Sequence, residues 1–294
     1  MLCTGADGFI GGALTSRLKE MGGNVRGTNL SLTENIVNPT VVNYLFEATQ
    51  PTAVFHLAAH AIVGKAEAET RGCFETNIMG TVNILEACRK WDCVEALVVA
   101  SSDKAYGRSP PPYKEDITPL DASNPYDTSK ACADMVARCY ASTYGLPVTA
   151  TRCSNVYGPG DLNWSRLIPY LARCLILGEM PLLHAGRGHV SKEWTYVDDV
   201  VDAYVLLAEK IGEAKGKAYN VGSGEVFTRD MILRKMEEAA GRLTGFAEEE
   251  AKFKQIDSQA LDSGRIRALG WTPKVDFKEG LRRSLEWYKE YLSS

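Results

Sequence analysis

The chain has 294 residues, 45% of them hydrophobic, and its formal net charge at neutral pH is −4. This length and composition suit a globular protein built from one large domain or two smaller ones. The 33 basic and 37 acidic residues are well mixed. No basic face or tail is therefore expected, which argues against nucleic acid or an anionic membrane as a partner.

The sequence contains no pattern of a membrane span or secretory signal, and its cysteines show no pattern of a disulfide framework. No apolar run approaches the roughly 18 residues needed to span a bilayer, and the opening MLCTGADGFIGG lacks the pattern of a secretory signal. The eight cysteines are scattered and form no CxxC pair. We interpret them as reduced core thiols and expect a cytoplasmic location. The four histidines have no ligand-like spacing, so no metal is expected.

Short apolar runs alternate with longer amphipathic stretches through the first half of the chain. Strand and helix alternating at this spacing predict right-handed crossovers and a doubly wound parallel sheet, a Rossmann-like α/β fold. The expected strands are 1–4, 24–28, 53–59, 95–102 and 147–156, and the expected helices lie near 11–22, 39–50, 73–91 and 125–144.

The second half is richer in loops. Helices are expected at 166–180 and 278–292, and 248–254 is expected to form a solvated helix face. The predicted domains are an NAD(P)-binding Rossmann domain and a smaller C-terminal α/β domain that binds the substrate. The first comprises residues 1–155 with a return segment at 194–212, and the second comprises 156–193 and 213–294.

The stretch TGADGFIG places Gly5, Gly8 and Gly11 after the first expected strand. Glycine suits a sharp turn that must approach a pyrophosphate closely, and the following helix offers unpaired N–H groups to the phosphates. The spacing and its position predict a dinucleotide site, and the alternative is a plain tight turn.

The choice between NAD and NADP depends on the end of the second strand. An acidic residue there would bind the ribose hydroxyls, and a basic one would accept a 2′-phosphate. Thr28 and Asn29 satisfy neither rule, and Arg26 comes earlier. We expect NAD rather than NADP because no arginine directly follows the strand.

The first strand has only four residues before the glycine turn, and little room separates the second strand from the next helix. Two interpretations stay open. The edge of the sheet that would bind the cofactor is built from unusually short segments, or residues are missing from the chain.

A tyrosine and a lysine occur as YDTSK at positions 126 to 130. At this i, i+4 spacing both side chains lie on one face of the expected helix. An adjacent ammonium lowers the pKa of a phenol, so Tyr126 beside Lys130 is expected to act as a base.

Six ordered motifs, TGADGFIGG, HLAA, TNIMGTVNILEAC, SSDKAYG, YDTSK and RCSNVYGPG, resemble the extended short-chain dehydrogenase/reductase family. More narrowly, they resemble its nucleotide-sugar epimerases and dehydratases. The resemblance covers nearly the whole chain and implies a nucleotide-diphosphate sugar as substrate. It also implies a homodimer formed through the helices near 71–90 and 125–144. The cofactor-binding residues it implies are Gly5, Gly8, Phe9, Ile10, Gly11, Asn29, Leu57, Ala58, Ala59, Asn77, Tyr126 and Lys130.

The same resemblance assigns substrate and catalytic roles. Ser102 would hydrogen-bond the 4-hydroxyl of the sugar, Tyr126 would take its proton, and Lys130 would hold the ribose and the phenolate. The substrate-binding residues it implies are Ser102, Asn155, Arg166 and Lys192. Lys192 stands where many relatives carry arginine, which keeps the charge but loses the bidentate fork.

Within the family, Asp103 and Lys104 separate two reactions. Epimerases leave these positions idle, whereas 4,6-dehydratases need a base for carbon 5 and an acid for the departing 6-hydroxyl. In this family the pair reads Asp-Glu in dehydratases of dTDP-sugars, and Asp-Lys in those of CDP-glucose and in some that act on UDP-N-acetylglucosamine. A lysine is a base only if its pKa is lowered, which burial and a cationic nicotinamide would do. The alternative is a solvated turn.

The sequence therefore predicts an NAD-dependent nucleotide-sugar 4,6-dehydratase, with CDP-glucose as a candidate substrate. It would form a 4-keto-6-deoxy sugar nucleotide through transient oxidation at carbon 4. One alternative is a 4-epimerase of the UDP-glucose and UDP-galactose type. Another is a non-catalytic nucleotide-binding sensor, against which the set Ser102, Tyr126 and Lys130 argues.

Overall fold

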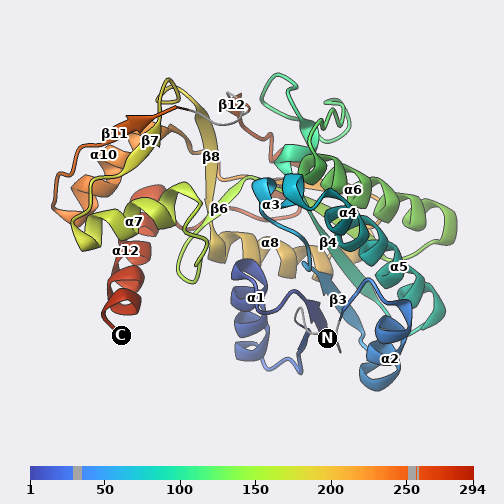
Figure 1. The fold of residues 1–294 in the computed structure, drawn as a ribbon. Coiled ribbons are helices and arrows are strands. Elements are labelled where there is room, and N and C mark those ends of the chain that lie inside the picture. The colour runs from blue at the N-terminus through green and yellow to red at the C-terminus, as the bar shows by residue number, and fades with distance from the viewer. Residues whose placement is uncertain (29–34, 251–255, 257) are drawn as a thin grey trace.

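The computed structural model of the chain describes residues 1–28, 35–250, 256 and 258–294 (Figure 1). A six-stranded sheet in the order β2-β1-β3-β4-β5-β9 forms its centre. Every neighbouring pair in this sheet is parallel. The strands are β1 Leu2–Thr4, β2 Arg26–Thr28, β3 Ala53–His56, β4 Ala96–Ser102, β5 Val148–Cys153 and β9 Ala218–Val221.

Strand β1 has β2 on one side and β3 on the other, so the chain reverses its direction across the sheet there. In doubly wound folds ligands bind beyond the carboxyl ends of the strands at such a switch point. The glycine turn follows β1 directly, and the Ser102 loop follows β4. The fold therefore brings the two motifs to the same edge of the sheet.

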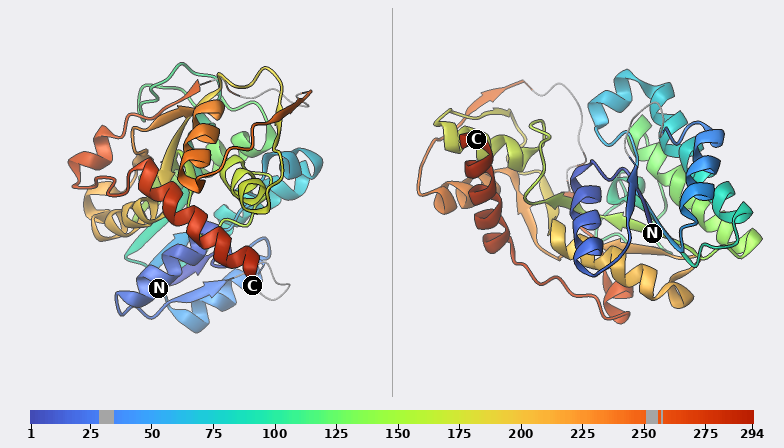
Figure 2. Two further views of the ribbon diagram at one scale, coloured as in Figure 1. Left: turned by 90° about the vertical axis from the view of Figure 1, so that its left-hand side faces the viewer. Right: turned by 90° about the horizontal axis from the view of Figure 1, so that it is seen from below.

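Helices cover both faces of this sheet, as Figures 1 and 2 show. One face packs against α1 (Phe9–Glu20) and α8 (Val197–Glu209). The other face packs against α2 (Pro39–Thr49), α5 (Gly80–Lys90) and α6 (Pro125–Tyr144). Helix α8 lies within the expected return segment 194–212, and its Val200, Val201 and Leu207 belong to the same core as Leu14 of α1.

A second core surrounds Tyr157 and Trp194, and the C-terminal helix packs into it. Here β10, β8 and β12 form a sheet, β6 also pairs with β8, and β11 pairs with β7. The strands are β6 Asn155–Tyr157, β7 Leu182–His184, β8 Ser191–Tyr196, β10 Val226–Thr228, β11 Ala247–Glu249 and β12 Ser258–Gln259. The packed helices are α7 Leu167–Leu177, α10 Arg229–Ala240 and α12 Phe277–Ser293.

Short helices complete the described chain. They are α3 Val63–Ala68, α4 Thr70–Phe74, the π-helix η1 Glu75–Met79, the 3-10 helix η2 Asp103–Tyr106, α9 Ile211–Ala214 and α11 Gly264–Ala268. No helix among the described residues is both long enough and apolar enough to cross a membrane.

Two predictions of secondary structure are wrong in detail. The helix expected over 73–91 is interrupted by η1, a π-helical turn of the kind that often occurs at functional sites. The helix face expected over 248–254 begins as a strand, because Glu248 and Glu249 pair with Leu183 and His184. The rest of that segment, apart from position 250, lies outside the described residues.

The turn between β1 and α1 shows why glycine is required there. Gly5 has a φ of 73°, and a Cβ on it would lie 2.7 Å from the backbone nitrogen of Ala58. A Cβ on Gly11 would lie 2.1 Å from the carbonyl oxygen of Gly5. The backbone of the turn, the loop after β3 and the first turn of α1 therefore pack together without intervening side chains.

Replacing Gly11 with alanine should weaken both the fold and NAD binding. The methyl group would push the turn away from α1, and overpacking of this kind costs about 1–3 kcal/mol. Denaturant unfolding and calorimetric titration with NAD measure the two losses. Gly12→Ala is the control, since its nearest contact would lie at an acceptable 3.4 Å. Equal effects of the two changes would contradict the close packing described for Gly11.

Candidate active site

Strand β4 ends at Ser102, and the chain turns at once into η2. The Ser102 hydroxyl accepts a hydrogen bond from the backbone nitrogen of Lys104 at 3.3 Å and donates one to Asp103 Oδ1 at 3.1 Å. Asp103 is only 1% exposed. The alternative of a solvated turn at SSDKAYG is therefore wrong.

Helix α6 begins at a strong start signal that fixes the position of Tyr126. Asn124 caps the helix by accepting from the nitrogen of Asp127 at 3.0 Å, and Pro125 occupies the first turn. Tyr126 follows in the same turn, and Lys130 lies one turn later on the same face. The helix thus carries the pair to the end of β4, where Ser101 Oγ donates to the carbonyl oxygen of Lys130 at 3.0 Å.

Lys130 is buried, and its Nζ donates to the carbonyl oxygen of Ala100 at 2.8 Å. Burial lowers its pKa to about 8, against the opposing influence of Cys73 and Cys153. Burial also raises the pKa of Tyr126, while the cations Lys104 and Arg166 act to lower it. The expected lowering of the Tyr126 pKa is therefore wrong for the protein groups alone. Burial outweighs the charges.

Lys104 projects from η2 toward the second sheet. Its Nζ donates to Asp103 Oδ1 at 3.4 Å and to Asn155 Oδ1, on β6, at 3.3 Å. Burial acts to lower the pKa of Lys104, but Asp103, Tyr126 and Asp127 outweigh it, so the pKa is raised. The expectation that this pKa would be lowered is wrong for the protein groups alone, because two carboxylates lie near the ammonium.

Asp127 is a buried carboxyl group that the sequence analysis missed. Its Oδ2 accepts from Asn124 Nδ2 at 2.5 Å, completing a reciprocal cap of α6. Burial raises its pKa to about 6, opposed by the charge of Lys104. The available signal was an acidic residue directly after the tyrosine in YDTSK, in a helical turn that faces the active site.

The residues expected to hold the dinucleotide gather beyond β1 and β3. Leu57, Ala58 and Ala59 follow β3, where the nitrogen of Leu57 donates to the carbonyl of Thr4 at 3.1 Å. The nitrogen of Ala58 donates to Thr4 Oγ1 at 3.2 Å. Gly8 caps α1 without a side chain, and Phe9 and Ile10 begin that helix. This side-chain-free cradle at a helix start fits the phosphates of NAD. Asn29 lies outside the described residues.

Asn77 connects η1 with the catalytic helix. Its Oδ1 accepts from the nitrogen of His60 at 2.7 Å, and its Nδ2 donates to Ser129 Oγ at 2.8 Å. Ser129 in turn donates to the carbonyl of Tyr126 at 2.7 Å. Through these contacts Asn77 links η1 to the loop after β3 and to the first turns of α6, so its role is structural.

His56 is bound on both ring nitrogens, by Thr4 Oγ1 at 2.7 Å and by Thr81 Oγ1 at 3.0 Å. Burial, followed by the charge of Lys130, lowers its pKa to about 3, so the ring is neutral. The described residues contain no group of three or more His, Cys, Asp or Glu able to hold a metal ion.

The expected substrate-binding residues come from the second sheet and its helices. Asn155 Nδ2 donates to the carbonyl of Glu193 at 3.1 Å. Arg166 pairs with buried Asp161 at 3.1 Å, and its positive charge acts to lower the pKa of Tyr126. Lys192 Nζ donates to the carbonyl of Ile256 at 2.6 Å and to Gln259 Oε1 at 2.5 Å. Its ammonium is therefore already engaged within the chain.

Glu193 is a second buried carboxyl group absent from the sequence predictions. Its Oε1 accepts from the nitrogen of Gly224 at 2.7 Å, and its Oε2 accepts from that of Leu261 at 2.6 Å. Burial raises its pKa from 4.5 to about 7 although both hydrogen bonds act to lower it. The carboxyl group therefore links β8 to the loop before β10 and to the loop after β12.

Because of Glu193, the free energy of unfolding should fall as the pH rises. The folded pKa lies above that of the unfolded chain, so the folded chain holds the extra proton between pH 4.5 and about 7. Across that window the group should remove up to about 3 kcal/mol from the unfolding free energy. Urea titrations at several pH values, compared with Glu193→Gln, measure this contribution. A stability difference between the two proteins that does not change with pH would contradict it.

Comparison with known proteins places this geometry in a family. Residues 1–222 match the NAD dependent epimerase/dehydratase family. The chain belongs to this family. It is 32% identical over 316 residues to the dTDP-glucose 4,6-dehydratase of Streptomyces griseus, covering 100% of this chain and 95% of that protein.

Solved structures include both reaction types. UDP-glucose 4-epimerase from Thermotoga maritima, solved with UDP-glucose, superposes with a TM-score of 0.93 at 28% identity and 99% coverage of both chains. A dTDP-glucose 4,6-dehydratase from Streptomyces venezuelae, solved with NAD, superposes with a TM-score of 0.88 at 28% identity, covering 99% and 97%. The predicted family, the Rossmann-like α/β fold, the enzyme class and NAD as cofactor are confirmed.

Proposed function

We propose that this family member is a nucleotide-sugar 4,6-dehydratase, which forms a 4-keto-6-deoxy sugar nucleotide. The observation that carries the proposal is the ion pair of buried Asp103 with Lys104, whose side chain is 26% exposed, beside Ser102. An epimerase needs no such pair, because it only removes and returns hydrogen at carbon 4. The Streptomyces griseus dehydratase that aligns with the whole chain supports the same reaction.

The proposed roles follow from the position of each group. Ser102 binds the 4-hydroxyl of the sugar, and Tyr126 takes the proton from that hydroxyl. Lys130 supports the ribose of the cofactor and the phenolate of Tyr126. The bound NAD would accept the hydride of carbon 4 and later return it to carbon 6. The transient ketone makes the proton on carbon 5 acidic, so Asp103 and Lys104 can eliminate water across carbons 5 and 6.

Cofactor and substrate contacts are proposed on the same basis. Gly5, Gly8 and Gly11, with the loop after β3, would hold the dinucleotide, and Asn77 would brace the site. Asn155, Arg166 and Lys192 lie on the substrate side. For Lys192 to reach a diphosphate, its Nζ must leave the carbonyl of Ile256 and the side chain of Gln259.

Which nucleotide the substrate carries is tested by offering the protein several sugar nucleotides in turn. CDP-glucose follows from the Asp-Lys pair, whereas the Streptomyces relatives act on dTDP-glucose according to their names. Incubation with CDP-, dTDP- and UDP-glucose and with UDP-N-acetylglucosamine, followed by alkali, should give the near-ultraviolet absorbance of a keto sugar. Galactose and glucose interconversion without that signal would establish the 4-epimerase, which the Thermotoga maritima neighbour keeps as the second candidate.

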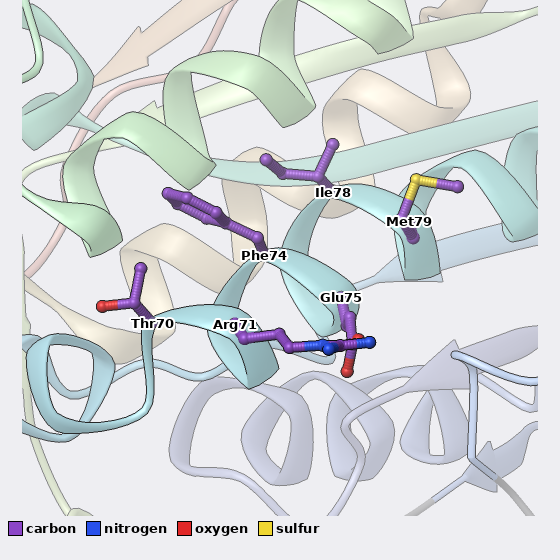
Figure 3. Close-up of a pocket in the computed structure, with 6 residues that line it drawn as sticks. All are labelled: Thr70, Arg71, Phe74, Glu75, Ile78 and Met79. Atoms are coloured by element: carbon purple, nitrogen blue, oxygen red, sulfur yellow. The ribbon is translucent and has the colours of Figure 1, made fainter.

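We also propose a homodimer formed through α4, η1 and α6. A shallow surface hollow on α4 and η1 contains an apolar floor and the ion pair of Arg71 and Glu75, whose atoms lie 2.7 Å apart (Figure 3). Its lining residues are Thr70, Arg71, Phe74, Glu75, Ile78 and Met79. Met79 of η1 and Met135 of the adjoining α6 are each at least half exposed. A second copy would cover these apolar side chains.

Phe74→Glu should dissociate the dimer, because the charge would be buried in the apolar contact. Light scattering after gel filtration measures the mass, and Ile117→Glu, on an exposed loop, is the control. A wild-type protein that is monomeric at all concentrations would contradict the dimer.

The domain division proposed for the chain is residues 1–155 with 194–212 for the cofactor, and 156–193 with 213–294 for the sugar nucleotide. The two separate cores around Leu14 and Tyr157 support a division into two parts. However, β9 lies in the central sheet, and Ile266 and Trp271 belong to the core around Leu14, so these later residues lie with the cofactor domain. A cytoplasmic location is also proposed, since all eight cysteines are free thiols.

A further inference from the structure

A buried chain of hydrogen bonds centred on His56 lies at the edge of the sheet that carries the glycine turn. His56 ends β3, and its register partner Thr4 ends β1. Thr4 Oγ1 lies 2.7 Å from His56 Nδ1, and Thr81 Oγ1, in the first turn of α5, lies 3.0 Å from His56 Nε2. All three residues are at most 3% exposed. The ring therefore connects two strand ends with the start of a helix.

The contact of Thr81 with Asn77 fixes the direction of this chain. Thr81 Oγ1 donates its one proton to the carbonyl oxygen of Asn77 at 2.7 Å, so toward His56 it can only accept. The proton of the ring is therefore on Nε2. Burial lowers the pKa of His56 to about 3, so the ring is neutral and Nδ1 accepts from the Thr4 hydroxyl. Thr4 Oγ1 in turn accepts from the backbone nitrogen of Ala58 at 3.2 Å.

Ala58 is the end of the chain that lies against the glycine turn. A Cβ on Gly5 would lie 2.7 Å from the Ala58 nitrogen and 2.9 Å from its Cα, so the two backbones are in close contact. The position of the loop after β3 therefore sets the shape of the cradle proposed to hold the phosphates of NAD. The Thr4 hydroxyl holds this loop at Ala58, and His56 directs the hydroxyl.

The opposite end of the chain holds the same loop at a second point. Asn77 Oδ1 accepts from the nitrogen of His60 at 2.7 Å, and its Nδ2 lies 3.2 Å from the carbonyl oxygen of His60. Nδ2 also donates to Ser129 Oγ, on α6, at 2.8 Å. The loop is thus fixed at Ala58 and at His60 from the two ends of one hydrogen-bond chain.

We propose that His56 is a positioning residue for the cofactor. With its proton on Nε2, the ring orients the Thr4 hydroxyl so that this hydroxyl holds Ala58, and with it the loop against which the glycine turn packs. This role needs no contact with the dinucleotide and no transfer of a proton. It rests on the cofactor contacts proposed above and is the same for an epimerase and a dehydratase.

The affinity of the NAD-free protein for NAD, measured by calorimetric titration, tests this role. His56→Leu removes both ring nitrogens. His56→Asn places an amide oxygen near the position of Nδ1, where it can accept from Thr4, but its side chain is too short to reach Thr81. The two variants therefore both lose the contact with Thr81 and differ in the contact with Thr4. His189→Gln, on an exposed loop before β8, is the control.

His56→Leu should weaken NAD binding about tenfold, and His56→Asn by less than about threefold. Urea unfolding should show similar losses of stability in both variants, so stability does not account for the difference in affinity. A leucine variant with wild-type affinity would overturn the proposed role. An asparagine variant that binds NAD as weakly as the leucine variant would overturn it as well.

A double-mutant cycle with Thr4→Val tests whether His56 acts through the Thr4 hydroxyl. Thr4→Val alone should weaken NAD binding about tenfold, and adding His56→Leu should weaken it no further. Additive losses would contradict the route through Thr4. If His56→Leu does not fold, Thr4→Val decides the question, because unchanged NAD affinity in that variant overturns the inference. A wild-type protein that binds no NAD would instead overturn the proposed cofactor site.

Discussion

Tyr126→Phe should lower turnover of the sugar nucleotide by about 10²–10⁴-fold while leaving NAD bound, the range expected for loss of a general base. The phenol lies at the start of α6, one turn before Lys130 and near the charges of Lys104 and Arg166. Removing only its oxygen leaves the ring and the helix cap in place. Rates of product formation and calorimetric titration with NAD measure the two effects.

The control for this change is Tyr44→Phe, since Tyr44 is an exposed tyrosine of α2. It should keep the wild-type rate. A Tyr126→Phe protein that converts substrate at close to that rate would show that another group takes the proton from the 4-hydroxyl.

Asp134→Asn should cost about 3–5 kcal/mol of unfolding free energy, the usual effect of breaking a buried ion pair. Both oxygens of Asp134 on α6 accept from Arg152 on β5, at 2.9 and 3.0 Å, and both side chains are almost fully buried. Arg152 Nη1 also donates to Tyr106 Oη at 2.7 Å, at the end of η2. Without the carboxylate, Arg152 would remain charged in the core beneath the catalytic loop.

Urea unfolding followed by fluorescence and circular dichroism measures this loss. Replacing Asp134 with leucine together with Arg152 with methionine should recover much of the stability, because no fully buried charge then remains unpaired. Arg138, which also pairs with Asp134 at 2.7 Å, is one-third exposed and stays solvated. Unchanged unfolding midpoints for Asp134→Asn would mean that the pair contributes little to the fold.

The fold could be predicted because its signals are local. The run ALVVASS reads as a strand buried on both faces, and it forms β4 in a parallel sheet. Asn124 and Pro125 are also a local signal, since a capping residue followed by proline predicts the start of α6. The π-turn at η1 and the strand at Glu248 and Glu249 depend on distant partners, namely helix α6 and strand β7, which the local sequence does not specify.

The candidate site could be predicted only in part. The i, i+4 spacing indicated Tyr126 and Lys130, and the family resemblance added Ser102. The structure places Ser102 at the end of β4 and the other two residues one turn apart on α6. The pKa of Lys104 is raised by Asp103, Tyr126 and Asp127, which outweigh burial, and its Nζ also donates to Asn155, 51 positions away. Spacing alone therefore gave the wrong direction for this pKa. Glu193 was not predicted for a similar reason. Its hydrogen-bond partners are backbone nitrogens of two loops that lie 31 and 68 residues further along the chain.

The path of one hydrogen tests the dehydratase function most directly. The protein is given the accepted sugar nucleotide carrying deuterium at carbon 4, and the product is examined by NMR. The proposed chemistry predicts a 4-keto-6-deoxy sugar with the deuterium in its carbon 6 methyl group, since the hydride leaves carbon 4 and returns to carbon 6. Deuterium recovered at carbon 4 of an epimerised sugar, with no methyl group formed, would contradict it.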